Sequence, residues 1–377
     1  MPKPVQTDST PVTELFFALI RCGIGKDTEL PQTPSTEEWQ EIFDMAKKQT
    51  LVGIAFAGIE AIPQEQRPAK SILLQWYQLS QIIKKKNSEL NRNCAAVSEK
   101  FRQEGFRNCI LKGQGIAQLY PDPTLRTPGD IDIWLDGGCE KVLQYVRKFI
   151  PDCKPTYHHV DFPVHPNLEI EAHFTPSWTY SPCKNRRLQK YMKECSTAQF
   201  SNATTTPEGS FTAPTTEFNR IYILLHIYRH LFQEGIGLRQ LLDYYFVLDQ
   251  GFTAEELEDT TCKLRSLGLY KFAAATMYVL HTMLGLDKEK MLMKPDIRRG
   301  SFLLNEIMRA GNFGNHDTRY RIVDKENEFR HFINSLQRIS RLISKYPSEV
   351  LWSPYFKTWH WFWRRKHRTK TKKLKTR

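Results

Sequence analysis

The chain has 377 residues, of which 40% are hydrophobic and 12% are aromatic. This length and composition predict two or more packed units with real cores, and they exclude wholesale disorder. The formal net charge is +13, but residues 364–377 alone carry nine Lys or Arg and no acidic residue, so most of the excess charge lies in a tail.

Residues 1–104 are predicted to form an N-terminal helical region. Ser35 and Glu38 have the spacing of a capping box, which opens a helix. A long helix is expected from about residue 69 to residue 103, because its apolar residues recur at helical spacing. The lysines at 84–86 within it are interpreted as a solvated helix face.

Residues 105–195 have a different pattern, which predicts a small mixed sheet. Short apolar or alternating runs, typical of strands, occur at 106–111, 130–135, 157–164 and 168–174. Helices are expected at 114–120 and 138–149, and a tight turn at 165–167 is expected to join the last two strands.

The second half of the chain is predicted to be helical after a break. Residues 196–216 hold ten Ser or Thr together with two prolines, which predicts a linker or loop. Residues 217–350 are expected to form a C-terminal helical region, with helices at 217–234, 238–249, 253–267, 269–284, 297–310 and 324–345. Residues 351–377 are expected to form an aromatic and basic tail. The expected fold class is α+β, with a small mixed-sheet core flanked by N-terminal and C-terminal helical regions.

The sharpest feature of the sequence is a pair of acids, Asp130 and Asp132. Residues two apart on a strand share a face, so the two carboxylates are expected to lie side by side while Ile131 and Ile133 point into the core. Paired carboxylates repel each other unless a cation lies between them, and they suit a hard divalent ion such as Mg²⁺. The alternative interpretation is an exposed edge strand whose acids block aggregation.

Two neighbouring motifs add to this pair. The run Lys112-Gly113-Gln114 ends one predicted strand and opens a helix, a place where backbone amides favour an anion. On a later strand Glu169 and Glu171 share a face, with His173 beyond them. A third carboxylate from an adjacent strand completes the ligands of a two-metal site.

The order of these motifs resembles that of the polymerase-β-type nucleotidyltransferase superfamily, and most closely its bacterial nucleotidyltransferase-like family. The residues that carry the resemblance are Leu111-Lys112-Gly113, Arg126 with Asp130 and Asp132, and Glu171 with His173. Further similarities, at Pro214, His226 and His230, Leu238 to Asp243, and Gly311 to Gly314, extend it from about residue 40 to residue 360. The sequence departs from the superfamily in the Lys-Gly-Gln turn, where Gly-Ser or Gly-Gly is usual, and in Glu171, which stands in place of an aspartate.

The resemblance implies an enzyme that moves a nucleoside monophosphate from an NTP to an acceptor hydroxyl and releases pyrophosphate. It implies that Asp130, Asp132 and Glu171 bind two Mg²⁺ ions and that Glu171 or Asp132 takes the proton. It also implies that Lys112, Gly113, Gln114 and Arg126 hold the nucleotide, while Glu169 and His173 support the metal ligands by hydrogen bonds. The acceptor stays open among a small molecule, a protein and an RNA.

The sequence also allows other interpretations of the function. The chain also fits a non-catalytic relative that binds a nucleotide or a partner, or a membrane-surface assembly protein linked to surface polysaccharide. Histidines at 158, 159, 165 and 173 lie near the acids and suit a transition-metal site. On a regular strand His158 and His159 point to opposite faces, so at most one of them is expected to join Glu171 and His173.

The tail combines an aromatic run, Pro354 to Trp363, with the basic residues 364–377. Residues 352–377 therefore suit an anionic membrane surface or a nucleic acid, and aromatic packing against the body is the plainer alternative. No apolar run reaches the roughly 18–20 residues of a membrane span, no signal peptide is apparent, and the eight cysteines form no Cys-x-x-Cys pair. These features predict a cytoplasmic protein with reduced thiols, with peripheral association at the inner membrane as an option.

Overall fold

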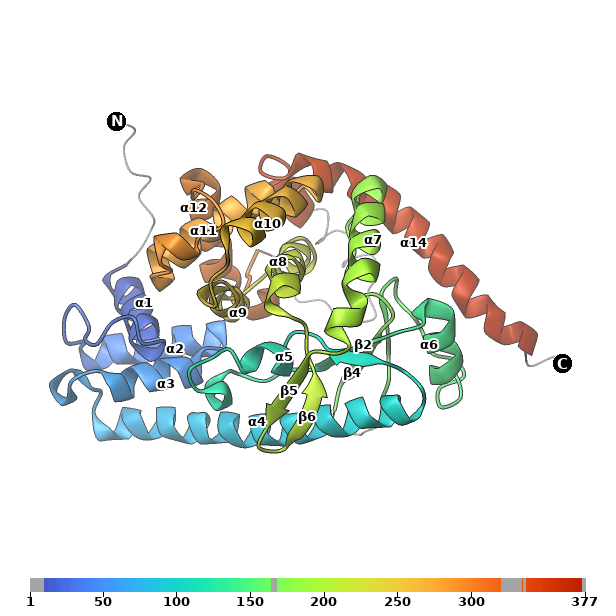
Figure 1. The fold of residues 1–377 in the computed structure, drawn as a ribbon. Coiled ribbons are helices and arrows are strands. Elements are labelled where there is room, and N and C mark those ends of the chain that lie inside the picture. Colours follow the sequence, from blue (N-terminus) through green and yellow to red (C-terminus); the bar gives the residue numbers. More distant parts are fainter. Residues whose placement is uncertain (1–9, 164–167, 320–333, 335–336, 375–377) are drawn as a thin grey trace. The chain divides into compact units, whose positions relative to one another are not determined.

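A computed structural model describes residues 10–163, 168–319, 334 and 337–374 (Figure 1). The chain divides into two compact units. The helical unit consists of Met1–Ser88, Ala117–Thr127 and Ile223–Leu336, and the sheet unit consists of Glu89–Ile116, Pro128–Tyr222 and Gln337–Arg377. The predicted α+β class is confirmed, because the described residues form many helices and a small mixed sheet.

The helical unit consists of helices whose starts carry clear sequence signals. The side chains of Thr10, Ser35, Thr253 and Asp296 each accept a hydrogen bond from a backbone amide of the first helical turn. The α-helices of this unit are α1 (Pro11–Gly23), α2 (Thr36–Gln49), α3 (Val52–Ala61), the first part of α4 (Lys70–Gln103), the last part of α8 (Thr216–Gln233), α9 (Leu238–Asp249), α10 (Ala254–Ser266), α11 (Tyr270–Leu284) and α12 (Ile297–Ala310). Short 3₁₀ turns are η1 (Gln64–Gln66), η2 (Pro123–Leu125), η3 (Lys288–Lys290) and η4 (Asn312–Gly314).

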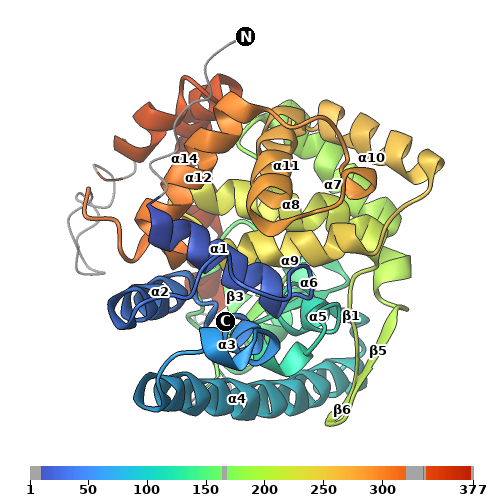
Figure 2. The ribbon, with the colours of Figure 1, turned by 90° about the vertical axis from the view of Figure 1, so that its left-hand side faces the viewer.

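Helices α1 and α3 pack against each other at very short range (Figure 2). A Cβ atom on Gly58 would lie only 2.2 Å from the carbonyl oxygen of Leu19, so only glycine fits at this contact. This contact brings the backbones of the two helices close together.

The sheet unit is built on four short strands in the order β1 (Asn108–Ile110), β2 (Ile131–Leu135), β4 (Ile170–His173) and β3 (His159–Asp161). The two central strands, β2 and β4, are parallel, and each outer strand is antiparallel to its neighbour. Ile131, Ile133 and Leu135 are buried in a core that they share with the end of α4 and with α6 (Gly138–Val146). Alternation along β2 places Asp132 on the opposite face, where Glu171 is its direct partner on β4.

Residues 196–216 are not the structureless linker that their composition predicts. Helix α7 (Pro182–Gln199) extends into this segment, and β5 (Ala203–Thr206) pairs with β6 (Gly209–Thr212) in an antiparallel hairpin. The threonines that indicated a loop also have high strand propensity, and Gly209 follows the short turn with a φ of +149°.

The predicted tail is part of a long helix, α14 (Pro347–Leu374). One side of α14 packs on the sheet unit, where the ring of Phe356 stacks on Trp178 with centroids 4.0 Å apart. None of the described helices has both the length and the apolar character that crossing a membrane requires. The predicted turn at 165–167 and most of the predicted helix at 324–345 lie outside the described residues.

Candidate active site

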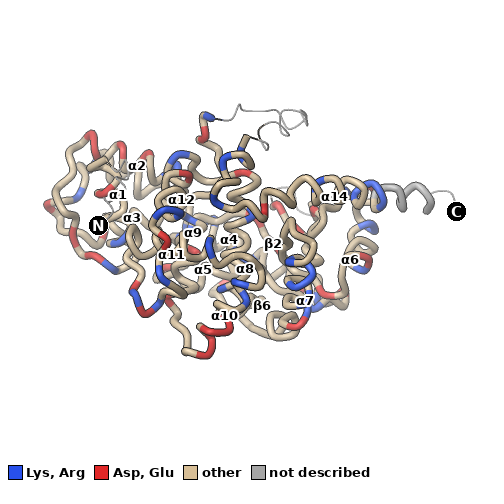
Figure 3. The backbone as a smooth tube through the Cα atoms, turned by 90° about the horizontal axis from the view of Figure 1, so that it is seen from above, with Lys and Arg blue, Asp and Glu red and all other residues tan. Residues whose placement is uncertain are grey.

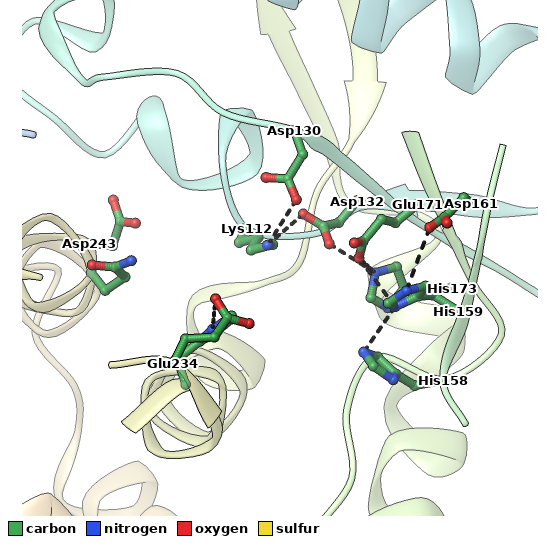
Figure 4. A network of polar contacts seen from close by, with 12 residues as sticks. Lys112, Asp130, Asp132, His158, His159, Asp161, Glu171, His173, Glu234 and Asp243 are labelled. Carbon is green, nitrogen blue, oxygen red and sulfur yellow. Dashed lines mark hydrogen bonds and ion pairs between the residues drawn. The ribbon is translucent and has the colours of Figure 1, made fainter. Parts of the chain in front are cut away.

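Asp130 and Asp132 lie on the same side of the sheet, as the alternation predicts (Figure 4). Asp132 is buried on β2, whereas Asp130 precedes the strand and its side chain is 34% exposed. The ammonium nitrogen of Lys112 is 3.0 Å from Asp132 Oδ2 and 3.4 Å from Asp130 Oδ2. A cation thus lies between the two carboxylates and offsets their repulsion.

Strand β1 brings Lys112 to this place. The amide of Leu111 donates a hydrogen bond of 2.9 Å to the carbonyl of Asp132, which extends the β1–β2 pairing by one residue and leaves Lys112 beside the acids. Burial alone lowers the pKa of Lys112, but the charges of Asp132 and Asp130 outweigh it and raise this pKa above its usual value. Lys112 is therefore a cation whose charge is already balanced.

Glu171 and His173 complete the polar face on β4. His173 Nε2 is 2.9 Å from Asp132 Oδ1 and 3.2 Å from Glu171 Oε2. Burial alone raises the pKa of Glu171, but the hydrogen bond with His173 and the charges of His159 and His173 lower this pKa to about 2. Burial alone lowers the pKa of His173, but its hydrogen bonds with Asp132 and Glu171 raise this pKa to about 9.

Both His158 and His159 join this cluster, although at most one of them was expected to do so. His159 Nδ1 is 3.2 Å from Glu171 Oε2, and His158 Nε2 is 3.1 Å from His159 Nδ1. The physical reason is that β3 begins at His159, so that His158 precedes the strand and does not follow its alternation. The indole N–H of Trp178 donates to His158 Nδ1 at 3.2 Å.

Asp161 belongs to the same cluster, although the motifs do not indicate it. Its Oδ1 lies 3.8 Å from His159 Nε2. Burial, followed by the charges of Glu171 and Glu169, raises the pKa of Asp161. The signal in the sequence is its position two residues after His159, which on a strand means the same face.

The other residues predicted to surround the acids differ in burial and in backbone conformation. Gly113 has a φ of +57°, the left-handed conformation that glycine adopts readily. The side chain of Gln114 is buried, and its amide nitrogen donates to Asn91 Oδ1. Glu169 precedes β4 and is exposed.

Arg126 does not lie with the acids but inside the helical unit. Its guanidinium donates to both oxygens of Asp243, through Nε at 2.7 Å and Nη2 at 2.8 Å, and the hydroxyl of Tyr120 donates to Asp243 Oδ1 at 2.7 Å. Arg126 is buried, and its planar guanidinium is paired with the carboxylate of Asp243. We therefore assign Arg126 a structural role in place of the predicted contact with the nucleotide.

The donor atoms of the sheet unit suit metal ions. Within the described residues, three groups bring their donor atoms close enough to share one ion, and the group nearest to the predicted site is Asp132 with Glu171 and His173. The other groups are His159 with Asp161 and Glu171, and His158 with His159 and His173. The carboxylates of Asp132 and Glu171 fit Mg²⁺, whereas a second ion beside Asp130 would take the place of the Lys112 ammonium group.

Comparison with known proteins indicates the family to which the chain is similar. A search among curated proteins gave no match. The model of a family described as uncharacterised nucleotidyltransferase matches residues 35–285, a segment that includes the motifs from Lys112 to His173 but ends before Gly311 to Gly314. Because the match takes in more than half of the chain, the protein belongs to this family of uncharacterised nucleotidyltransferases.

Proposed function

We propose that this protein is a Mg²⁺-dependent nucleotidyltransferase that moves a nucleoside monophosphate from an NTP to an acceptor hydroxyl and releases pyrophosphate. The observation that carries the proposal is the buried carboxylate of Asp132, whose two oxygens face different cations. Oδ1 faces His173 Nε2 at 2.9 Å, and Oδ2 faces Lys112 Nζ at 3.0 Å. A buried carboxylate that opens to two sides suits a ligand shared between positively charged groups.

In the proposed reaction, the acceptor oxygen forms a bond to the α-phosphorus while the bond from this phosphorus to the β-phosphate oxygen breaks. Asp132 and Glu171 would hold Mg²⁺, which when bound stabilises charge on the phosphoryl oxygens and lowers the pKa of the attacking hydroxyl. With its pKa near 2, Glu171 stays ionised at neutral pH. This favours Glu171 as a metal ligand and leaves Asp132, the other residue that the resemblance implies for this role, to take the hydroxyl proton.

Lys112 is the residue that we propose to neutralise the triphosphate. Its charge is balanced by Asp130 and Asp132 in the structure. Once those acids hold metal ions, the ammonium group is released for the β- and γ-phosphates. Lys112→Ala should therefore weaken the binding of an NTP more than that of AMP, and equal losses in calorimetry would place Lys112 outside the phosphate site.

The test of the proposed function is a transfer assay with each α-³²P-labelled NTP, Mg²⁺ and fractions of a cell extract. We expect label from at least one NTP to enter an acceptor, and we expect Asp132→Asn to abolish the transfer. Glu194→Gln, which removes an exposed acid on α7, is the matched control and should retain the transfer. Nucleotide binding without labelled product from any NTP would favour the non-catalytic relative.

A second proposal concerns α14, whose outward side we propose to bind an anionic membrane surface. Apolar side chains recur there at helical spacing and are 37–69% exposed: Leu351, Trp352, Tyr355, Trp359 and Phe362, named here the α14 stripe. Lys and Arg also occur on α14 (Figure 3), and Arg364, Arg365 and Lys366 follow Phe362 closely in the sequence. Exposed Trp and Tyr with neighbouring cations match the headgroup region of an anionic bilayer.

A further inference from the structure

We propose that His173 is itself a metal ligand, together with Asp132 and Glu171, and that its imidazole makes this position select a transition-metal ion over Mg²⁺. The inference rests on the proposed function for the use of the ion, but it replaces Mg²⁺ by a transition-metal ion at this one position. It rests on the geometry of the three side chains for the ion's place and identity.

The separations between the three donor atoms are those of a metal site. His173 Nε2 lies 2.9 Å from Asp132 Oδ1 and 3.2 Å from Glu171 Oε2. A transition-metal ion that binds nitrogen and oxygen at about 2.0–2.2 Å holds neighbouring ligand atoms about 2.9–3.4 Å apart. Both distances from His173 Nε2 therefore fit one shared ion, and the three donor atoms all lie within 4.8 Å of one another.

The backbone holds these atoms firmly in place. Asp132 and Glu171 are direct partners in the parallel pairing of β2 with β4, and His173 follows Glu171 on the same face. Asp132 and His173 are each 3% exposed. Ligands on two paired strands lose little conformational entropy when they bind an ion.

Two further histidines lie beside these ligands. His159 Nδ1 is 3.2 Å from Glu171 Oε2, and His158 Nε2 is 3.1 Å from His159 Nδ1. Within the described residues, His159 with Asp161 and Glu171 is a further group whose donor atoms are close enough to share one ion. Nitrogen donors thus surround Glu171, and imidazole nitrogen is a ligand that transition metals favour.

The chemistry of the ligands then selects the ion. Mg²⁺ prefers an all-oxygen, octahedral set that includes several waters, whereas imidazole nitrogen suits Mn²⁺ weakly and Fe²⁺, Co²⁺ and Zn²⁺ more strongly. A site of two carboxylates and one imidazole is therefore expected to prefer a transition metal. The competing account is that His173 stays protonated and only holds the two carboxylates in place for Mg²⁺.

The experiment uses the full chain after removal of metals with a chelator, with Mn²⁺ as the probe. Pulsed electron paramagnetic resonance of bound Mn²⁺ detects coupling to the nitrogen of a coordinated imidazole. We expect this coupling in the unaltered chain, and we expect Mg²⁺ to displace Mn²⁺ only at a large excess. If Mn²⁺ binds without nitrogen coupling, or if Mg²⁺ displaces it at equal concentration, the inference is overturned.

The variant His173→Gln sharpens the test, because glutamine still donates a hydrogen bond to the acids but is a poor ligand for Mn²⁺. It should lose the nitrogen coupling and more than the roughly 10- to 100-fold in Mn²⁺ affinity that the loss of a residue supporting a metal ligand costs. Glu194→Gln, at an exposed acid on α7, should lose neither. Unchanged coupling and affinity in His173→Gln would sink the inference. None of these measurements requires the protein to catalyse a reaction. Nucleotidyl transfer without a preference for Mn²⁺ over Mg²⁺ would refute only the inference. A preference for Mn²⁺ without nucleotidyl transfer would refute only the proposed function.

Discussion

Arg126 and Asp243 form a bidentate ion pair inside the helical unit, with N–O distances of 2.7 and 2.8 Å. Both side chains are buried, and Tyr120 donates a further hydrogen bond to the same carboxylate. In the sequence, Arg126 stands four residues before Asp130 and Asp243 lies in the helical segment that also contributes to the resemblance. Arg126 and Asp243 are thus each other's charge partners inside the helical unit.

The first prediction follows from this pair. Arg126→Ala should lower the free energy of unfolding by about 3–5 kcal/mol, because it leaves the carboxylate of Asp243 buried and unpaired. The measurement is urea unfolding of the full chain, monitored by circular dichroism. The double variant Arg126→Met, Asp243→Leu is the control and should recover most of the loss. A stable Arg126→Ala variant with selectively weakened NTP binding would restore Arg126 to the nucleotide site.

The second prediction separates the two aspartates. In a chelator, Asp132→Asn should lower the free energy of unfolding by about 1.5–3 kcal/mol, since it removes the charge that Lys112 and His173 share. Asp130→Asn should change it by less than about 0.5 kcal/mol, because Asp130 is partly exposed and only 3.4 Å from Lys112 at its closest. Equal effects of the two substitutions would mean that the buried cluster does not stabilise the fold.

The third prediction concerns pH and His360 on α14. Burial, with a smaller contribution from the charge of Arg364, lowers the pKa of His360 to about 4 from an ordinary value near 6.5. The unfolded chain therefore takes up this proton at a higher pH than the folded chain. Because of this difference, the contribution of neutral His360 to the free energy of unfolding is fully present above about pH 6.5 and is lost as the pH falls toward 4.

The variant His360→Phe tests this directly. Its melting temperature should fall less steeply between pH 6.5 and 4 than that of the unaltered chain, because Phe cannot take up a proton. His316→Phe, at an exposed histidine of the helical unit, is the control and should leave the slope unchanged. Parallel slopes for His360→Phe and the unaltered chain would contradict the assignment.

The fourth prediction concerns the α14 stripe. Replacing Trp352, Tyr355 and Phe362 by Ser should abolish co-sedimentation with vesicles that contain phosphatidylglycerol, with little effect on folding because these side chains are exposed. Binding of the unaltered chain should weaken in salt, since the Debye length falls from about 10 Å at 0.1 M to about 3 Å at 1 M. Stronger binding to single-stranded RNA than to vesicles, unaffected by the substitutions, would exclude the membrane proposal.

Periodicity in the sequence predicts most of the described elements of this fold. Helix α9 spans Leu238–Asp249 and helix α12 spans Ile297–Ala310, the same ranges that the apolar spacing predicts. The strand that carries Asp132 is predicted to within one residue, because alternation between buried isoleucines and acids has a period of two. Such local patterns depend only on neighbouring residues.

Pairings between distant segments are not predicted in this way. Nothing near Arg126 indicates that Asp243 is its partner, and nothing near Lys112 indicates that its ammonium group lies between two acids. The place of His158 was misjudged because it depends on where β3 starts, and strand ends are set by tertiary contacts. The β5–β6 hairpin was missed because threonine occurs in both loops and strands.

Trp178 connects the cluster to the distal part of the chain. Its N–H donates a hydrogen bond to His158 Nδ1, and its ring stacks on that of Phe356 on α14. During synthesis, a chain emerges from its N-terminus, and segments fold as their partners become available. The ribosome adds Phe356 long after Asp132 and Glu171, so the nascent protein contains the proposed metal ligands well before the helix that covers Trp178 has been translated.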